Sequence, residues 1–309
     1  SITDEARPFE RETDLNIFDP DNPNQPAYTA EYEARYRAAQ VARNRRITAW
    51  VQQTLEDLRK AIDRDEFKLQ YQPIVSMEER VTVGFEALVR WQHPRLGTLL
   101  PTDFVHVAER SGLINQIGLF VLHKATADFA KIIETTGRDL FVSTNISSRE
   151  LLRNDIVQDI QQALDNSGLA ANQLRIEVTE SMVMDNPEHS TQILRRIKDL
   201  GVSISLDDFG TGYSSLAYLL RFAFDTIKID KSFVQARAQH ERLVILRSII
   251  ALAHSLDQSI IAEGIEYESD VTDLLQLGCE YAQGYFFGEP MLVNEVVKMV
   301  MDEASAEKV

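Results

Sequence analysis

The chain has 309 residues, of which 48 are acidic and 32 are basic, so its formal net charge is −16. This length allows one large domain or two small ones, each with a sizeable core. The acidic balance argues against a nucleic-acid polymer as a partner, because affinity for such polymers comes mainly from Lys and Arg that replace counterions on phosphates. It leaves open a small anionic ligand held through metal ions.

Cysteine content and apolar segments bear on the compartment of the protein. Cys279 is the single cysteine, so no internal disulfide can form, which fits a reducing compartment. No segment reaches the ~18 consecutive apolar residues of a membrane helix, and no signal-peptide pattern opens the chain. We expect a cytoplasmic domain with no direct membrane insertion, and leave open that its parent is anchored to the inner membrane. Because the chain begins at Ser1 rather than Met, we expect it to be part of a longer protein.

The first 64 residues differ in pattern from the rest. Residues 1 to about 30 are rich in Asp, Asn and Pro without a sustained period, which predicts an extended arm. From 28 to 63 apolar residues recur mostly three or four apart, most clearly between Ile47 and Ile62, which predicts a helix. This helix either packs on the side of the domain or links it to an upstream domain. We therefore predict an arm and linker helix over 1–64 and a barrel domain over 65–309.

After residue 65, short apolar segments typical of strands alternate with helical stretches. The predicted strands are 67–74, 81–91, 140–146, 174–179, 202–207, 225–230, 259–263 and 279–286. The predicted helices are 101–134, 148–168, 187–200, 213–220, 232–255, 268–277 and 292–303. Strands and helices in this number and order favour an α/β fold of the (β/α)8, TIM-like barrel type. A doubly wound open sheet is the alternative, but no Gly-x-Gly-x-x-Gly turn follows the first strand.

Polar residues share one face of several predicted strands. Side chains alternate between the faces of a strand, so Glu86 and Arg90 lie opposite the apolar side chains of Val83 and Phe85. Barrel enzymes build their sites at the carboxyl ends of the strands. The other polar residues predicted to point into the barrel or to lie at these ends are Ser143, Asn145, Glu177, Ser203, Ser205, Asp207, Thr226, Lys228, Asp230, Glu263 and Gln283.

The acidic members of this set predict a metal site. Burying several carboxylates close together is costly without a compensating cation. An all-oxygen set suits Mg²⁺ or Mn²⁺, and no His or Cys residues have zinc spacing. A pair of carboxylates as in glycosidases is an alternative, but Lys228, Asn145 and the tandem Asp207-Asp208 are better explained by metals. The candidate metal ligands are Glu86, Asn145, Glu177, Asp207, Asp208 and Glu263.

Motifs over about residues 65 to 300 carry a family resemblance. They are Gln72-Pro73-Ile74, Glu86-Ala87-Leu88-Val89-Arg90-Trp91, Asn145-Ile146-Ser147, Glu177-Val178-Thr179-Glu180, Asp207-Asp208-Phe209-Gly210, Ile227-Lys228-Ile229-Asp230, Ala262-Glu263-Gly264-Ile265-Glu266 and Gln283-Gly284-Tyr285. With these motifs in this order the chain resembles the EAL-domain family of cyclic di-GMP phosphodiesterases. The resemblance implies a modified barrel whose first strand is antiparallel to the rest.

The resemblance also implies a reaction, the hydrolysis of cyclic di-GMP to linear 5'-pGpG with Mg²⁺ or Mn²⁺, which lowers the level of this second messenger. It implies that Glu86, Asn145, Glu177 and Asp207 bind one metal ion, and that Asp207 bridges to a second ion held also by Asp208. No departure from the family pattern occurs at these positions. The alternative is a catalytically silent receptor that binds cyclic di-GMP without cleaving it.

Further residues receive roles by the same resemblance. Lys228 and Glu263 would orient or deprotonate the attacking water, with Glu86 as a further catalytic residue. Because nearby carboxylates favour the charged form of Lys228, we favour water positioning and charge stabilisation for it, and Glu263 as the base, with a metal-ligand role left open for Glu263. Glu180 would anchor the loop 208–216. The residues implied at the substrate are Gln72, Leu88, Arg90, Asp230, Glu266 and Gln283.

The resemblance extends to partners. It implies a homodimer formed through the barrel. The segment Ile17-Phe18-Asp19-Pro20 and the charged helix after it resemble the connection that follows a GGDEF domain in tandem GGDEF-EAL proteins. We therefore expect an upstream GGDEF or sensor domain in the parent protein.

Overall fold

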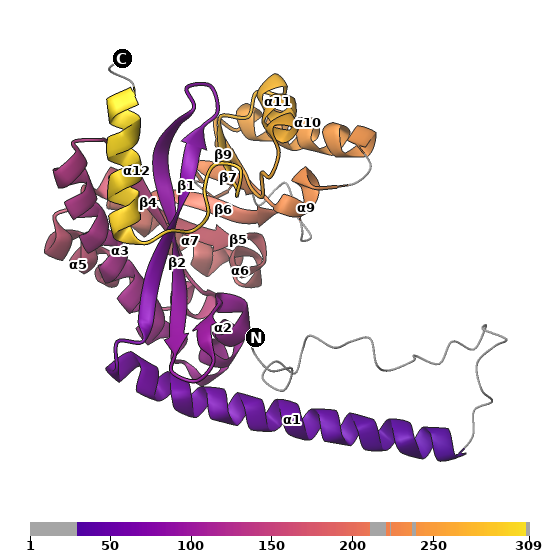
Figure 1. Ribbon diagram of the computed structural model, residues 1–309. Helices are drawn as coiled ribbons and strands as arrows, with labels where there is room; N and C mark the ends of the chain where they lie inside the picture. The colour runs from indigo at the N-terminus through magenta and orange to yellow at the C-terminus, as the bar shows by residue number, and fades with distance from the viewer. Residues whose placement is uncertain (1–29, 211–220, 223, 237–238, 307–309) are drawn as a thin grey trace. The chain divides into compact units, whose positions relative to one another are not determined.

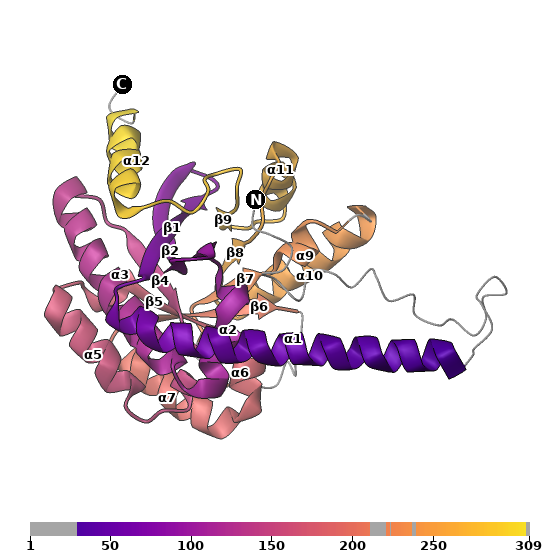
Figure 2. The same ribbon diagram turned by 60° about the horizontal axis from the view of Figure 1, so that its bottom comes forward.

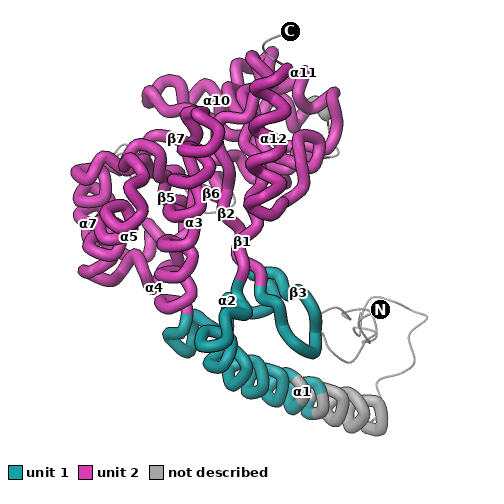
Figure 3. Tube along the Cα trace, turned by 60° about the vertical axis from the view of Figure 1, so that its left-hand side comes forward, with its two compact units in different colours: residues 1–67, 91–113 teal, residues 68–90, 114–309 magenta. Residues whose placement is uncertain are grey.

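The computed structural model of the protein describes residues 30–210, 221–222, 224–236 and 239–306 (Figure 1). The chain divides into two compact units, one of Ser1–Phe67 with Trp91–Leu113 and one of Lys68–Arg90 with Ile114–Val309 (Figure 3). The predicted boundary between residues 64 and 65 stays a prediction. No helix in the described residues is both long and apolar enough to cross a membrane.

The strands of the second unit form a closed barrel. Neighbouring strands pair in parallel in the order β2, β4, β5, β6, β7, β8 and β9. Strand β1 closes the barrel by pairing with both β9 and β2. The pairing of β1 with β9 is antiparallel. The predicted barrel with an antiparallel first strand is therefore confirmed, and the alternative prediction of a doubly wound open sheet is wrong. The strands are β1 (Phe67–Ser76), β2 (Val81–His93), β4 (Phe141–Asn145), β5 (Leu174–Thr179), β6 (Ser203–Phe209), β7 (Thr226–Ile229), β8 (Ser259–Ala262) and β9 (Tyr281–Gln283).

Helices cover the outside of the barrel, with α3, α5 and α7 packed in sequence along one side (Figure 2). The apolar face of each strand lies beneath them; for example, the Phe129 ring of α3 packs on those of Tyr71 and Phe85, with centroids 5.3 and 5.7 Å apart. The helices and short turns are α3 (Ile114–Thr136), α4 (Ser148–Leu151), α5 (Ile156–Ser167), the 3-10 turn η1 (Ala171–Gln173), α6 (Glu180–Asp185), α7 (Pro187–Asp199), α9 (Lys231–Val234), α10 (Gln239–Ser255), α11 (Glu268–Gln276) and α12 (Val293–Ala306).

Several predicted helix boundaries were wrong for local reasons. The predicted helix 101–134 ends first at Gly112, whose φ of 81° is the left-handed conformation that terminates helices. The predicted helix 148–168 is two helices, since α4 begins with a capping box between Ser147 and Glu150 and ends at Leu151. The short α6 was not predicted, and the predicted helix 213–220 lies outside the described residues.

The first unit joins helix α1 (Ala30–Asp63) to the end of β2, the short strand β3 (Gly97–Leu99) and α2 (Pro101–Ser111). Sequence patterns predicted α1 but not β3. The rings of Phe67, Trp91 and Phe104 form its core, each within 6 Å of the other two between centroids. Buried His93 connects α1 to the β2–β3 turn, because its Nδ1 accepts from two backbone amides and its Nε2 lies 3.2 Å from Asp57 Oδ2. The ring proton therefore sits on Nε2 and is donated to Asp57.

Asp57→Ala is expected to destabilise the protein by about 1–3 kcal/mol, the cost of leaving a buried donor without an acceptor. Asp57 Oδ2 also accepts from Gln53 Nε2 at 3.0 Å and Arg95 Nη2 at 2.9 Å, so three donors lose their shared acceptor. Urea unfolding followed by circular dichroism measures the change. Asp63→Ala, at an exposed position of the same helix, is the control. Equal midpoints for the two variants would contradict the importance of this contact.

Candidate active site

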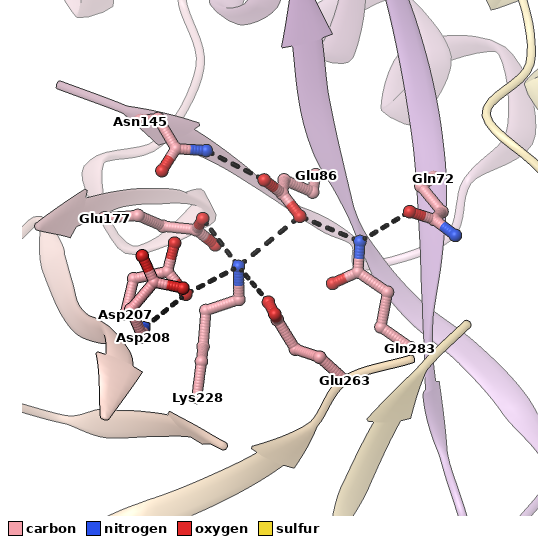
Figure 4. A network of polar contacts seen from close by, with 9 residues as sticks. All are labelled: Gln72, Glu86, Asn145, Glu177, Asp207, Asp208, Lys228, Glu263 and Gln283. Atoms are coloured by element: carbon pink, nitrogen blue, oxygen red, sulfur yellow. Dashed lines mark hydrogen bonds and ion pairs between the residues drawn. The ribbon is translucent and has the colours of Figure 1, made fainter. Parts of the chain in front are cut away.

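The predicted polar side chains meet at the carboxyl ends of the barrel strands (Figure 4). They come from seven strands or the residues directly after them, so the alternation of side chains along each strand aims them into one place. The members are Glu86 on β2, Asn145 at the end of β4, Glu177 on β5, Asp207 on β6, Lys228 on β7, Glu263 after β8 and Gln283 at the end of β9.

Lys228 lies at the centre of this group. Its side chain is 1% exposed, and its Nζ lies 2.7 Å from Glu263 Oε1, 2.8 Å from Glu177 Oε2, 3.4 Å from Glu86 Oε2 and 3.5 Å from Asp207 Oδ1. Burial acts to lower the pKa of Lys228, but the four carboxylates raise that pKa well above its ordinary value. The side chain is therefore a charged ammonium.

Glu86 is held by two amides as well as by Lys228. Asn145 Nδ2 donates to Glu86 Oε1 at 2.8 Å, and Gln283 Nε2 donates to Glu86 Oε2 at 2.8 Å. Gln283 Nε2 also lies 3.1 Å from Gln72 Oε1, which continues the network across to β1. Burial acts to raise the pKa of Glu86, but Lys228 and the two amides lower it below its ordinary value. Glu86 is therefore an anion fixed in orientation.

If all the carboxyl groups of the site were ionised, they would carry more negative charge than one ammonium can balance. Burial, with the charges of Asp207 and Glu86, raises the pKa values of Glu177 and Glu263 to about 8, although Lys228 acts in the opposite direction. Asp208 is exposed beside them, in the left-handed conformation with φ 55°, and its amide donates to Asp207 Oδ1 at 3.0 Å. Partial burial of its carboxyl group and the charge of Asp207 raise the pKa of Asp208 as well. The site thus favours binding of additional positive charge.

The donor set fits a divalent cation. In the described part of the chain, no three acidic, His or Cys side chains surround one point as ligands, since the carboxylates converge on Lys228 Nζ instead. Glu177 Oε1 and Gln283 Oε1 are nevertheless buried without a hydrogen-bond partner among the described atoms. Carboxylate and amide oxygens are the ligands that Mg²⁺ and Mn²⁺ prefer. The sequence-based assignment of Glu86, Asn145, Glu177, Asp207 and Asp208 as the ligands that would hold such ions stays a prediction.

A cavity of about 290 Å³ opens beside this cluster. Among the residues predicted to bind substrate, Gln72, Glu266 and Gln283 line it, together with the proposed catalytic residues Glu86 and Glu263. Three other side chains that line it were not predicted as site residues: Lys231, Gln235 and Tyr285. Tyr285 belongs to one of the motifs and Lys231 directly follows another, so both could have been found from the sequence. Gln235 has no such signal; its Nε2 donates to Glu266 Oε1 at 3.0 Å.

Four other predicted residues lie outside the lining of this cavity. Arg90 is buried, and its Nε donates to Gln70 Oε1 at 2.7 Å. Leu88 is half-buried on the same strand, and Asp230 caps helix α9 by accepting from the Ser232 amide at 3.0 Å. Glu180 Oε2 accepts from the Gly210 amide at 3.4 Å. The rest of the loop that Glu180 was predicted to anchor, residues 211–216, lies outside the described residues.

Comparison with known proteins agrees with this geometry. Residues 55–290 match the EAL domain family. The chain is 40% identical over 237 residues to the cyclic di-GMP phosphodiesterase NbdA and 38% identical over 249 residues to the bifunctional diguanylate cyclase/cyclic di-GMP phosphodiesterase MucR, both of Pseudomonas aeruginosa. These matches cover 76% and 80% of this chain but only 30% and 36% of the two relatives.

Among solved structures, the PaMucR phosphodiesterase in complex with c-di-GMP superposes with a TM-score of 0.76 at 38% identity. The match covers 79% of this chain and 99% of that one. The family match, the identity to curated relatives and the shared barrel lead to one conclusion: the chain belongs to the EAL domain family.

Proposed function

We propose that this chain is a metal-dependent phosphodiesterase that hydrolyses cyclic di-GMP to linear 5'-pGpG and so lowers the level of this second messenger. The observation that carries the proposal is the group of four carboxylates around the buried Lys228 at the carboxyl ends of the strands, in which Glu177 Oε1 has no hydrogen-bond partner among the described atoms. The relatives named as cyclic di-GMP phosphodiesterases support the choice of substrate.

The metal ions are proposed to be two Mg²⁺ or Mn²⁺. Glu86, Asn145, Glu177 and Asp207 would hold the first, and Asp207 with Asp208 the second. When bound, such a pair activates water and stabilises the charge that develops in an in-line phosphodiester displacement.

The protein's own groups would position and deprotonate the water. Lys228 Nζ donates hydrogen bonds to the water and to a phosphate oxygen on which charge builds up. In its ionised form Glu263, 2.7 Å from Lys228 Nζ, receives the water proton at a carboxylate oxygen, and its raised pKa of about 8 makes that oxygen a stronger base than an ordinary carboxylate. A role for Glu263 as a metal ligand instead is the alternative assignment.

The dinucleotide would lie in the cavity beside this cluster. Gln72, Glu266 and Gln283 line that cavity and offer amide donors and carboxylate acceptors to a nucleotide. Arg90, Leu88 and Asp230 complete the proposed substrate-binding set, in which the planar guanidinium of Arg90 suits two phosphate oxygens at once.

Metal removal tests the proposal. Purified chain stripped with a chelator is expected to leave cyclic di-GMP intact, and added Mg²⁺ or Mn²⁺ is expected to restore conversion to pGpG, measured by chromatography of the nucleotides. Tight binding by calorimetry together with intact nucleotide after long incubation with either metal would overturn it in favour of a silent receptor. Equal turnover with and without chelator would overturn the role of the metals.

The proposal includes the setting of the site. We place the domain in the cytoplasm, in a parent protein with an upstream GGDEF or sensor domain, and as a homodimer through the barrel. The bifunctional name of the relative MucR, of which this chain matches about a third, supports the upstream domain. Analytical ultracentrifugation of the purified chain tests the dimer, and a monomer at all concentrations and metal conditions would refute it.

A further inference from the structure

The barrel interior beneath the active site is lined by small polar residues. Strand register places Ser143 beside Arg175, Glu177 beside Ser205, Ser205 beside Thr226 and Thr226 beside Ser259. Partners in neighbouring strands project to the same face, about 4.8 Å apart. Barrels of this type normally fill this space with branched apolar side chains.

Several polar atoms of this layer are buried without a protein partner. The Oγ atoms of Ser143 and Ser205, both 0% exposed, have no hydrogen-bond partner among the described atoms, and neither have Nε and Nη1 of Arg175. The hydroxyls of Thr226 and Ser259, in contrast, satisfy each other at 2.9 Å. Because buried polar groups in native proteins are nearly always hydrogen-bonded, the unsatisfied atoms require another partner.

The position of Arg175 is fixed by an aromatic ring. Its guanidinium lies over the Phe141 ring, 3.9 Å from the centroid. That ring occupies the space where Gly84 has no side chain, since a Cβ at Gly84 would lie 2.6 Å from the ring atoms. The face of the guanidinium is thus covered by the ring, and its N–H groups point outward in the guanidinium plane, where an acceptor can reach them.

Water meets these requirements better than an anion does. A water molecule accepts from the N–H groups of Arg175 and both donates to and accepts from serine hydroxyls. An anion would lie near Glu177, two residues after Arg175 on β5, and near Asp207, two residues after Ser205 on β6. Both carboxyl groups would be within about 7 Å of this layer. The surplus of negative charge in the active site disfavours it.

We propose that ordered water molecules bind among Ser143, Arg175 and Ser205 in the barrel interior and link the Arg175 guanidinium to the two serine hydroxyls beneath the active site. The layer of the barrel interior beneath the active site is then hydrated rather than apolar. The inference depends on the fold alone and not on the proposed reaction.

Whether Tm falls or rises when a serine hydroxyl is removed tests the proposal. If water satisfies the hydroxyls, Ser143→Ala and Ser205→Ala each lose hydrogen bonds and are expected to lower Tm by about 2–4 °C. If the hydroxyls are dry, alanine relieves an unsatisfied buried group and Tm stays equal or rises, which would overturn the proposal. Ser248→Ala, the same substitution at an exposed position of α10, is the control and is expected to leave Tm unchanged.

A high-resolution crystal structure of the same chain provides the direct measurement. Waters are expected at about 2.7–3.2 Å from Arg175 Nε or Nη1 and from both serine Oγ atoms. In Arg175→Met, which replaces the guanidinium by a shorter side chain without N–H donors, the waters next to position 175 are expected to disappear. Direct contacts of these polar atoms with protein groups, or an anomalous peak at this place after a bromide soak, would overturn the assignment to water.

Discussion

Glu86→Ala is expected to lower kcat for cyclic di-GMP by at least about a hundredfold, the loss typical of removing one preorganised electrostatic group. Glu86 accepts hydrogen bonds of 2.8 Å from the side-chain amides of Asn145 and Gln283, and it lies 3.4 Å from the ammonium of Lys228. Alanine removes a proposed metal ligand and frees the two amides that orient the site. Turnover and metal affinity should therefore fall together.

The measurement is a nucleotide assay at saturating Mn²⁺, combined with calorimetric titration of Mn²⁺ into the protein without nucleotide. Glu78→Ala is the matched control, since Glu78 is exposed on the turn between β1 and β2 and the substitution is chemically the same. Wild-type metal affinity in a folded Glu86→Ala variant would show that Glu86 is not a ligand. Retained turnover would remove it from the reaction altogether.

The strand faces could be predicted because a strand has only two of them. Once Val83 and Phe85 are assigned to the helix side, Glu86 has no other direction than the barrel interior. The same argument applies to Glu177 and Asp207, so that the meeting of these side chains in Figure 4 follows from a two-residue period and the geometry of a closed barrel.

Helix ends and the cavity lining depended on information that the sequence patterns do not carry. The break between α2 and α3 rests on one left-handed residue, Gly112, inside a continuous apolar period. Gln235 reaches the site only because α9 packs against the turn after β8, where Gly264 has φ 71° and a Cβ would lie 2.4 Å from Lys231 Cβ. Such close approaches are tertiary, and no local spacing encodes them.

Which buried polar groups have hydrogen-bond partners could likewise not be predicted from the sequence. Ser143 and Ser205 were predicted to face inward, and they do lie in the buried interior. Whether an inward hydroxyl has a partner depends on which residue stands beside it in the next strand, as the paired Thr226 and Ser259 show. Register decides this, and register was not predicted.

Lys228→Met is expected to lower kcat by about 10²–10³-fold and to change how the protein responds to metal. Methionine keeps the length of the side chain but removes the charge, so four carboxylates lose their shared ammonium. Breaking a buried ion network by removing one partner typically costs about 3–5 kcal/mol. Without metal, the variant should therefore unfold at a clearly lower temperature than the wild type.

Divalent ions should reverse this loss, because they supply the missing positive charge to the same oxygens. The rise in Tm on adding saturating Mn²⁺ should consequently be larger for Lys228→Met than for the wild type, because a ligand that binds more tightly stabilises the folded state more. Lys131→Met, at an exposed position of α3, is the control and should show the wild-type rise. An equal rise in all three proteins would mean that metal ions and Lys228 do not share these carboxylates. A larger rise with turnover still lost would separate the two functions of the ammonium: holding the carboxylates together in the absence of metal, and acting on water and phosphate in its presence.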